Sequence, residues 1–136
     1  MFNRKLSPFA MELIKLFHLK PGDARAAEAV FTNVTVPEGT KLSSEGSTTR
    51  QLVLVLQGEV EVSRDGEIIN VLGPGSVIGE ITALDVRHEQ TATAVATTEC
   101  RVAIASATDL PRIKDVTGLF LHMHHLASVR TLSPTA

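Results

Sequence analysis

Cysteine is nearly missing from this 136-residue sequence, which contains Cys100 alone. A single cysteine excludes a framework of intramolecular disulfides and favours a reducing compartment, so we expect a cytoplasmic protein. Because Cys100 stands in the β-rich run Thr98–Val102, we interpret it as a buried structural thiol rather than a reactive one.

Long hydrophobic runs are missing as well. No stretch approaches the roughly 20 apolar residues that cross a bilayer. Glu12, Lys15 and His18 interrupt the apolar residues near the N-terminus, and no small-residue cleavage site follows them. The sequence therefore predicts no membrane span and no signal peptide, but an amphipathic N-terminal helix.

The sequence also lacks a large excess of charge of either sign. It has 13 lysines and arginines and 15 aspartates and glutamates, for a net charge of −2. This balance provides no basic field for nucleic acid. Catalytic signatures are missing too: the sequence has neither a Gly-x-Ser-x-Gly elbow nor a Walker loop. We expect a protein that is not an enzyme.

The sequence does contain a helical N-terminal part. Ser7 is suited to a helix N-cap and Pro8 to the first helical position. The first helix is expected to end near Lys20–Gly22, because proline and glycine interrupt it there. A second, alanine-rich helix is expected over Asp23–Phe31.

From Val34 onward, turn signals recur about every ten residues between short β-rich runs, which is typical of a sandwich or jelly roll. Leu52–Leu56 is apolar on both faces and predicts a central strand. Val60 and Val62 alternate with polar residues, as in a half-buried strand, and Asp65-Gly66 can form a hairpin turn. Further strands are expected at Ile68–Ile69, Val71–Leu72, Thr91–Ala96 and Arg101–Ile104.

After Ile104 the spacing of apolar residues becomes helical again, with a longer helix expected from about Val116. We expect one domain with N-terminal helices at 1–33, a β-roll core at 34–105 and C-terminal helices at 106–136. One stripe of the last helix could form the seam of a homodimer. Its residues are Leu119, Met123 and Leu126.

The segment Gly73–Leu84 carries the strongest chemical signal. Gly79 would let the backbone approach a ligand closely, and a helical turn that begins at Glu80 would point free N–H groups at an anion. The Glu80 carboxylate only accepts hydrogen bonds, which suits a pair of sugar hydroxyls. Stabilisation of its own helical turn is an equal alternative for this residue.

The order of these turns and strands from Val34 to Ile104 resembles the cyclic-nucleotide-binding domain family. The motifs that carry the resemblance are Pro37-Glu38-Gly39, Glu45-Gly46, Leu52–Val60, Leu72-Gly73-Pro74-Gly75, Ile78-Gly79-Glu80 and Ala92-Thr93. The resemblance implies a mainly β fold with flanking helices, a double-stranded β-helix (jelly roll). It also implies a regulatory or sensor module that binds a cyclic mononucleotide, cAMP before cGMP, without a metal or other cofactor.

The resemblance also implies roles for single positions. Glu80 corresponds to the glutamate that binds the ribose 2′-hydroxyl, and Thr91 to the small residue beside the cyclic phosphate. The helix around His122–Arg130 would close over the base. The phosphate-binding turn is implied at Gly79, Glu80, Ile81, Thr82 and Ala83, and apolar residues near the purine at Ile69, Leu72 and Val77.

One position departs from the family: Gln90 stands where the family has an arginine. Glutamine can still donate to phosphate but lacks the charge and the bidentate fork, which weakens binding by about ten- to a hundredfold. Arg87 could substitute, although a solvated loop charge is the simpler interpretation. The alternative function is a degenerate scaffold of the same fold that binds no nucleotide and dimerises through its last helix.

The histidines do not predict a metal site. His122 and His125 share a helical face, but the sequence supplies no third ligand, so a solvated or interface face is the better interpretation. A metal-binding cupin is also a jelly roll, but its first strands carry histidines, and residues 34–77 contain none. The family's helix-turn-helix domain would begin only beyond Ala136, so direct DNA binding is not expected.

Overall fold

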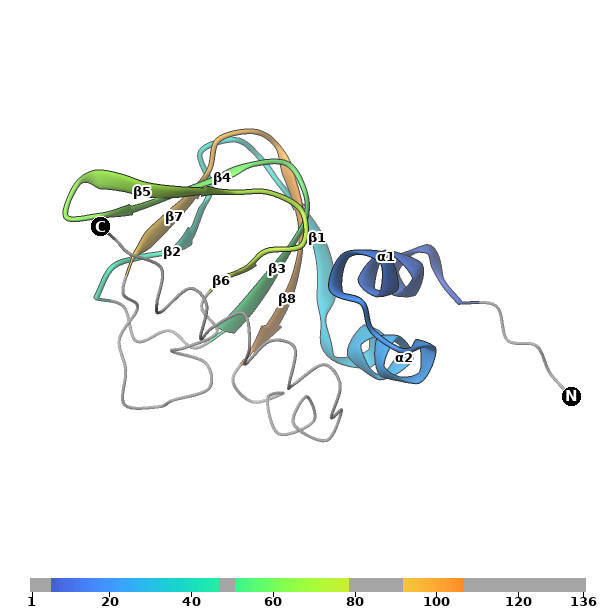
Figure 1. The fold of residues 1–136 in the computed structure, drawn as a ribbon. Helices are drawn as coiled ribbons and strands as arrows, with labels where there is room; N and C mark the ends of the chain where they lie inside the picture. The colour runs from blue at the N-terminus through green and yellow to red at the C-terminus, as the bar shows by residue number, and fades with distance from the viewer. Residues whose placement is uncertain (1–5, 47–50, 79–91, 107–136) are drawn as a thin grey trace, which may run out of the picture.

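The computed structural model describes residues 6–46, 51–78 and 92–106, which form two helices followed by eight strands (Figure 1). The helices are α1 (Pro8–Phe17) and α2 (Pro21–Val30). The strands are β1 (Thr32–Val36), β2 (Lys41–Ser43), β3 (Gln51–Gln57), β4 (Val60–Arg64), β5 (Glu67–Leu72), β6 (Val77–Ile78), β7 (Thr93–Ala96) and β8 (Cys100–Ser106).

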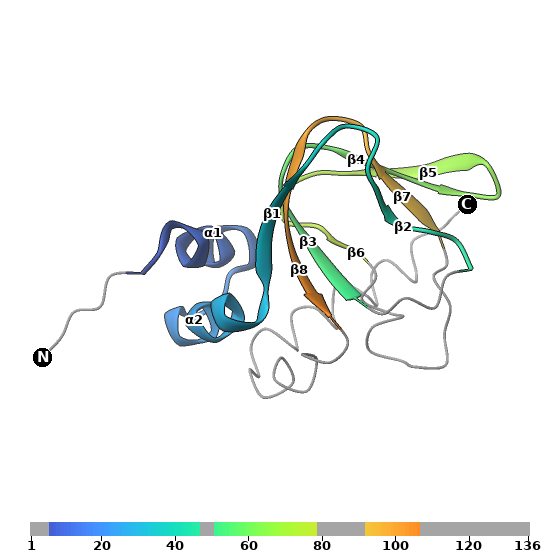
Figure 2. The ribbon, with the colours of Figure 1, turned by 180° about the vertical axis from the view of Figure 1, so that it is seen from behind.

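The strands form two four-stranded antiparallel sheets, in the orders β1-β8-β3-β6 and β2-β7-β4-β5. The chain passes repeatedly from one sheet to the other, which is the arrangement of a jelly roll. Figure 2 shows the helix pair beside β1, outside the roll. The prediction of a mainly β jelly roll with flanking helices is confirmed.

Strand β3 lies inside its sheet, between β8 and β6, and contributes to two apolar clusters. Leu52, Leu54 and Leu56 pack on the helix side, whereas Val53 and Val55 pack between the sheets. Since side chains alternate along a strand, both faces of β3 are buried, and the predicted central strand is confirmed. The buried helix residues on the first face are Ala10, Leu13, Phe17, Ala24, Ala27 and Val30.

The first helix begins with the predicted signals, whereas the second begins at a residue that was predicted to end the first. Ser7 caps α1, and its Oγ accepts a hydrogen bond from the Ala10 N–H at 3.0 Å. The helix ends sooner than predicted because His18 adopts a left-handed conformation with φ 57°. Pro21 begins α2, since its fixed φ suits the first helical position, so the second helix starts at Pro21 and not at Asp23.

The β4–β5 hairpin has the predicted turn. Asp65 and Gly66 have φ values of 53° and 82°, and the flanking residues Arg64 and Glu67 pair across the turn. Two positive φ angles in a two-residue loop match the right-handed twist of the strands. Val60 is fully buried at the other end of β4, as the alternation predicts.

Three strands were not predicted: β1, β2 and β6. Each of these segments is short or half polar. They are strands because β1 pairs with β8, β2 with β7 and β6 with β3. The predicted strand Thr91–Ala96 is described from residue 92, where β7 occupies Thr93–Ala96. The predicted helix from Val116, with Leu119, Met123 and Leu126, lies outside the described residues. No helix within the described ranges is long and apolar enough to span a membrane.

Candidate ligand-binding site

The candidate anion-binding turn belongs to the part of the sequence between β6 and β7. Strand β6 ends at Ile78 in the first sheet, and β7 begins at Thr93 in the second. The segment between them therefore leaves one sheet and enters the other. Most predicted site residues lie outside the described residues, and their roles stay predictions: Gly79, Glu80, Ile81, Thr82, Ala83, Arg87, Gln90 and Thr91.

The backbone that leads into this segment is fixed on strand β3. Val77 and Ile78 pair with Leu54 and Val53. Just before β6, the Gly75 N–H donates to the Val55 carbonyl at 2.9 Å, and the Val55 N–H donates to the Ser76 carbonyl at 2.9 Å. The entrance to the candidate turn is thus held by the central strand of the first sheet.

The apolar residues expected near the purine do not share one face. Leu72 belongs to the cluster between the sheets, and Ile69 is half-buried on β5. Val77 instead packs in the helix-side cluster, behind the sheet, so it does not line the interior that Leu72 lines. Its neighbour Ile78 does lie between the sheets. Strand alternation permits only one of the two to face inward.

The sequence did not predict that Ile78 faces the interior of the roll. Its signal would have been the pairing of β6 with β3, because Ile78 lies opposite Val53, which faces the interior, and Val77 lies opposite Leu54, which faces the helices. A two-residue strand carries no periodicity of its own, so the sequence did not show this register.

Helix α1 lies close to the turn before β6. Gly75 has φ +93°, and a Cβ at this position would lie 3.4 Å from the Leu16 carbonyl oxygen. Val77, Leu13 and Phe17 belong to the same buried cluster. The helix pair therefore supports, from outside the roll, the strand that enters the candidate turn.

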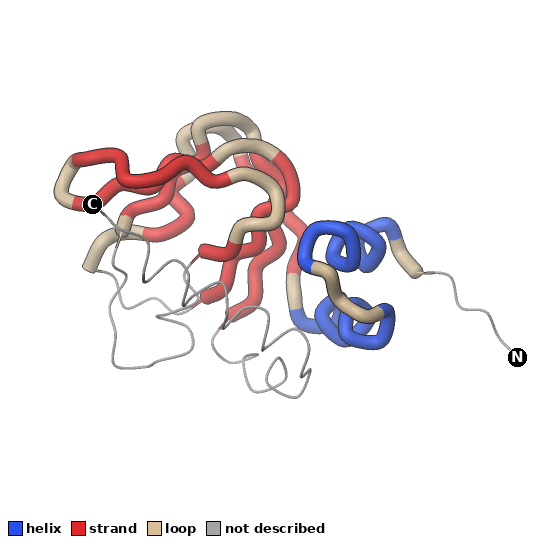
Figure 3. Tube along the Cα trace, viewed as in Figure 1, coloured by secondary structure: helices blue, strands red, loops and turns tan. Residues whose placement is uncertain are grey.

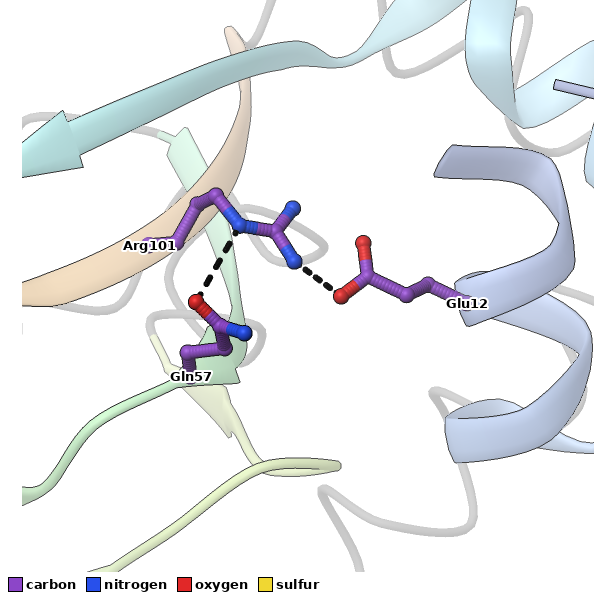
Figure 4. Close-up of polar contacts among 3 residues, drawn as sticks. All are labelled: Glu12, Gln57 and Arg101. Carbon is purple, nitrogen blue, oxygen red and sulfur yellow. Dashed lines mark hydrogen bonds and ion pairs between the residues drawn. The ribbon is translucent and has the colours of Figure 1, made fainter. Parts of the chain in front are cut away.

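An ion pair joins α1 to the same sheet (Figure 4). The Arg101 guanidinium donates through Nη2 to the Glu12 carboxylate and through Nε to Gln57 Oε1, the latter at 3.5 Å. The hydrogen bond to Glu12 raises the pKa of Arg101, while burial opposes the rise. Since the Arg101 and Glu12 side chains are 24% and 26% exposed, water screens much of the attraction.

Cys100 is 1% exposed, which confirms the predicted buried thiol. Its Sγ donates to the carbonyl oxygens of Glu59 and Thr98, each at 3.4 Å. In the part of the chain that the structure describes, no group of three or more histidine, cysteine, aspartate or glutamate residues could hold a metal ion. The predicted histidine face with His122 and His125 lies outside that part.

Two facing antiparallel sheets in jelly-roll order, with a helix pair packed on one outer face, define a β-roll. The family model described as "Cyclic nucleotide-binding domain" matches residues 33–116. The chain belongs to this family, whose members are regulatory ligand-binding domains. The resemblance predicted from the sequence is confirmed.

Solved structures agree with this assignment. The Thermus thermophilus catabolite activator protein is 28% identical, with a TM-score of 0.73, over 85% of this chain and 57% of that one. This chain thus spans little more than half of that protein. A cyclic nucleotide-binding domain from Methylobacillus flagellatus is similar in fold, with 22% identity and a TM-score of 0.76 over 90% and 78% of the two chains.

A third similar fold is that of PfPKA-R (141-441), solved with cAMP bound. It shares 16% identity and a TM-score of 0.71 with this chain, over 93% of this chain and 48% of that one. No curated protein sequence matches the chain significantly.

Proposed function

We propose that this chain is a cytoplasmic regulatory module, not an enzyme, that binds a cyclic mononucleotide, with cAMP preferred to cGMP. The observation that carries the proposal is the family match over residues 33–116, which includes the whole connection from β6 to β7. The similar fold of a protein solved with cAMP bound supports the same ligand class.

In this proposal the cyclic phosphate binds the backbone N–H groups of Gly79–Ala83, and Glu80 accepts a hydrogen bond from the ribose 2′-hydroxyl. Thr91 lies beside the phosphate. The base lies toward the interior of the roll, where Leu72 and Ile78 belong to the cluster between the sheets. Since Val77 packs in the helix-side cluster, it lies away from the base in this proposal.

Gln90 sets the expected affinity. A neutral amide replaces a guanidinium at the phosphate, so binding is weaker than in members with arginine by about ten- to a hundredfold. Isothermal titration of the whole chain with cAMP and cGMP at near-millimolar concentrations tests the proposal directly. Gln90→Arg is expected to tighten cAMP binding by the same ten- to hundredfold factor, about 1.5–3 kcal/mol.

The matched control is Asn33→Arg, which adds the same charge on the exposed strand β1. It is expected to leave the affinity unchanged within about twofold, because a solvated charge at a distance is screened. Absence of binding heat for both the wild-type chain and Gln90→Arg would overturn nucleotide binding. The degenerate scaffold would then be the better description, and sedimentation would test its dimerisation through Leu119, Met123 and Leu126.

Glu80→Gln separates the two interpretations of that residue. Loss of affinity at an unchanged melting temperature supports a contact with the ribose. A lower melting temperature at unchanged affinity supports stabilisation of the helical turn by its carboxylate.

A further inference from the structure

Strand β5 forms one edge of the second sheet, and within the described ranges it pairs with β4 alone. The β4–β5 hairpin projects beyond the neighbouring strands (Figure 3). An edge strand presents backbone N–H and C=O groups that another strand can use. Whether this edge is open or protected depends on its side chains.

Apart from the exposed Glu67 at its start, the side chains of β5 do little to protect it. Ile68 is 60% exposed and Val71 is 52% exposed. The run Ile68–Leu72 contains no charge and no proline, the two residue features that most often prevent edge-to-edge pairing. A short apolar β-forming run of this kind is prone to pair with another chain.

An irregularity in the hairpin brings both residues to the surface. Val62 pairs with Asn70 and Ser63 with Ile68, so Ile69 has no partner in the register. An unpaired residue shifts the alternation of side chains on its strand. Ile68 and Val71 therefore both become exposed, although strict alternation would separate them.

The exposed edge is self-complementary. If two copies of Glu67–Leu72 pair antiparallel about a two-fold axis, Ile68 of one copy lies opposite Val71 of the other, and Glu67 lies opposite Leu72. The two Ile68–Val71 pairs then bring apolar side chains together, and no like charges meet, which favours such pairing although Glu67 faces Leu72 and Ile69 faces Asn70. The occupant that this edge fits best is a second copy of the chain.

Asn70 works against this pairing. Its side-chain Oδ1 accepts a hydrogen bond from the Val71 N–H at 2.8 Å. The Val71 N–H is thereby hydrogen-bonded within its own strand and is less available to the strand of a second copy. We propose that the edge of β5 is an association surface for a second copy of this chain and that Asn70 holds it closed.

The test is the self-association of Asn70→Val, measured by sedimentation equilibrium of the full chain over a range of concentrations. The variant removes the acceptor and raises the β propensity of the edge. It is expected to tighten association by about tenfold or more relative to wild type, because each copy regains a backbone donor. If the wild-type chain dimerises through another surface, the same tightening is expected in the equilibrium between dimer and tetramer.

Three further variants keep the result interpretable. Asn70→Asp retains an acceptor for the Val71 N–H and is expected to associate no more than wild type. Ile68→Lys combined with Asn70→Val is expected to reverse the gain, because a lysine then enters the pairing. Asn33→Val makes the same substitution on β1, an edge of the other sheet, and is expected to have no effect.

The proposal is overturned if folded Asn70→Val, checked by circular dichroism, sediments as wild type. It is also overturned if Asn33→Val associates equally, or if the added lysine does not reverse the effect. None of these outcomes depends on nucleotide binding. The association test therefore remains decisive even if the chain binds no nucleotide.

Discussion

Gly58 occupies a crowded corner between β3 and β4. Its φ is +97°, and a Cβ at this position would lie 2.6 Å from both Cys100 Sγ and the Glu99 carbonyl oxygen. The neighbouring Glu59 carbonyl accepts hydrogen bonds from the Thr97 N–H and from Cys100 Sγ. Glycine is required here by its backbone angle and by the space that the buried thiol occupies.

Gly58→Ala is therefore expected to destabilise the fold, and Gly39→Ala provides the control. Gly39 has nearly the same backbone angle, φ +91°, but nothing lies within 4 Å of a Cβ there. The left-handed angle costs about 1–2 kcal/mol in both variants. Overpacking against Cys100 adds about 1–3 kcal/mol in Gly58→Ala alone.

The free energy of unfolding in urea measures this difference. Equal losses in the two variants would contradict the role assigned to the Cys100 contact. Cys100→Ala in the Gly58→Ala background gives a second check, because it is expected to relieve part of the excess.

At the scale of elements, Ser7 links the two helices. Its Oγ accepts from the Ala10 N–H and donates to the Glu28 carboxylate on α2. Ser7→Ala removes both bonds and is expected to lower the free energy of unfolding by about 1 kcal/mol, in line with other N-caps. Ser7→Asp keeps an acceptor for the cap but brings two carboxylates together.

The double variant Ser7→Asp/Glu28→Gln is therefore expected to be more stable than Ser7→Asp. Thermal unfolding of the wild type, Ser7→Ala, Ser7→Asp and the double variant measures separately what the helix cap and the link between the helices contribute to stability. If Glu28→Gln does not improve Ser7→Asp, the contact between Ser7 and Glu28 does not contribute to the pairing of the helices.

Elements encoded in a few adjacent residues were predictable from the sequence. The cap at Ser7, the turn at Asp65-Gly66 and the doubly apolar strand Leu52–Leu56 each carry their own signal, and the structure confirms all three. Strand β6 carries none, because two residues have no periodicity and depend on β3 for their pairing. The family resemblance implied Val77 near the purine, but the sequence alone did not show that Val77 packs on the helix side and Ile78 between the sheets.

The same limit applies to long-range polar contacts. Glu12 and Arg101 are 89 positions apart, and nothing in either local sequence pairs them. The Gly79-Glu80 motif could be singled out because the chemistry expected of it lies in consecutive residues, and its role stays a prediction. The supports of that motif, Gly75 against α1 and β6 on β3, come from the packing of the whole molecule.

At the scale of the whole molecule, strand β6 takes part both in the packing of the helix pair and in the approach to the candidate site. Its Val77 packs in the helix-side cluster, and its end at Ile78 directly precedes Gly79. Helix α1 lies close to Gly75 at the Leu16 carbonyl, and it is joined to β8 through the Glu12–Arg101 ion pair. If loosening α1 loosens β6, ligand binding and helix docking are linked, and each must strengthen the other to the same extent.

Glu12→Gln tests this link. A partly exposed ion pair contributes about 0.2–1 kcal/mol, so the variant is expected to lose at most that much stability. If the chain binds cAMP as proposed, its affinity is expected to fall by no more than about fivefold, the equivalent of the same free energy. Glu38→Gln, in the exposed turn after β1, removes the same charge and is expected to change neither quantity.

Salt distinguishes the ion pair from other effects of the substitution. At 1 M ionic strength the screening length falls to about 3 Å, so the wild-type chain and Glu12→Gln are expected to converge in stability and in affinity. Hydrogen exchange of the Val77 and Ile78 amides, measured without ligand, reports whether the loosened helix reaches β6. Faster exchange in Glu12→Gln than in Glu38→Gln supports the link. Unchanged exchange together with unchanged affinity would show that α1 and the candidate site are energetically independent.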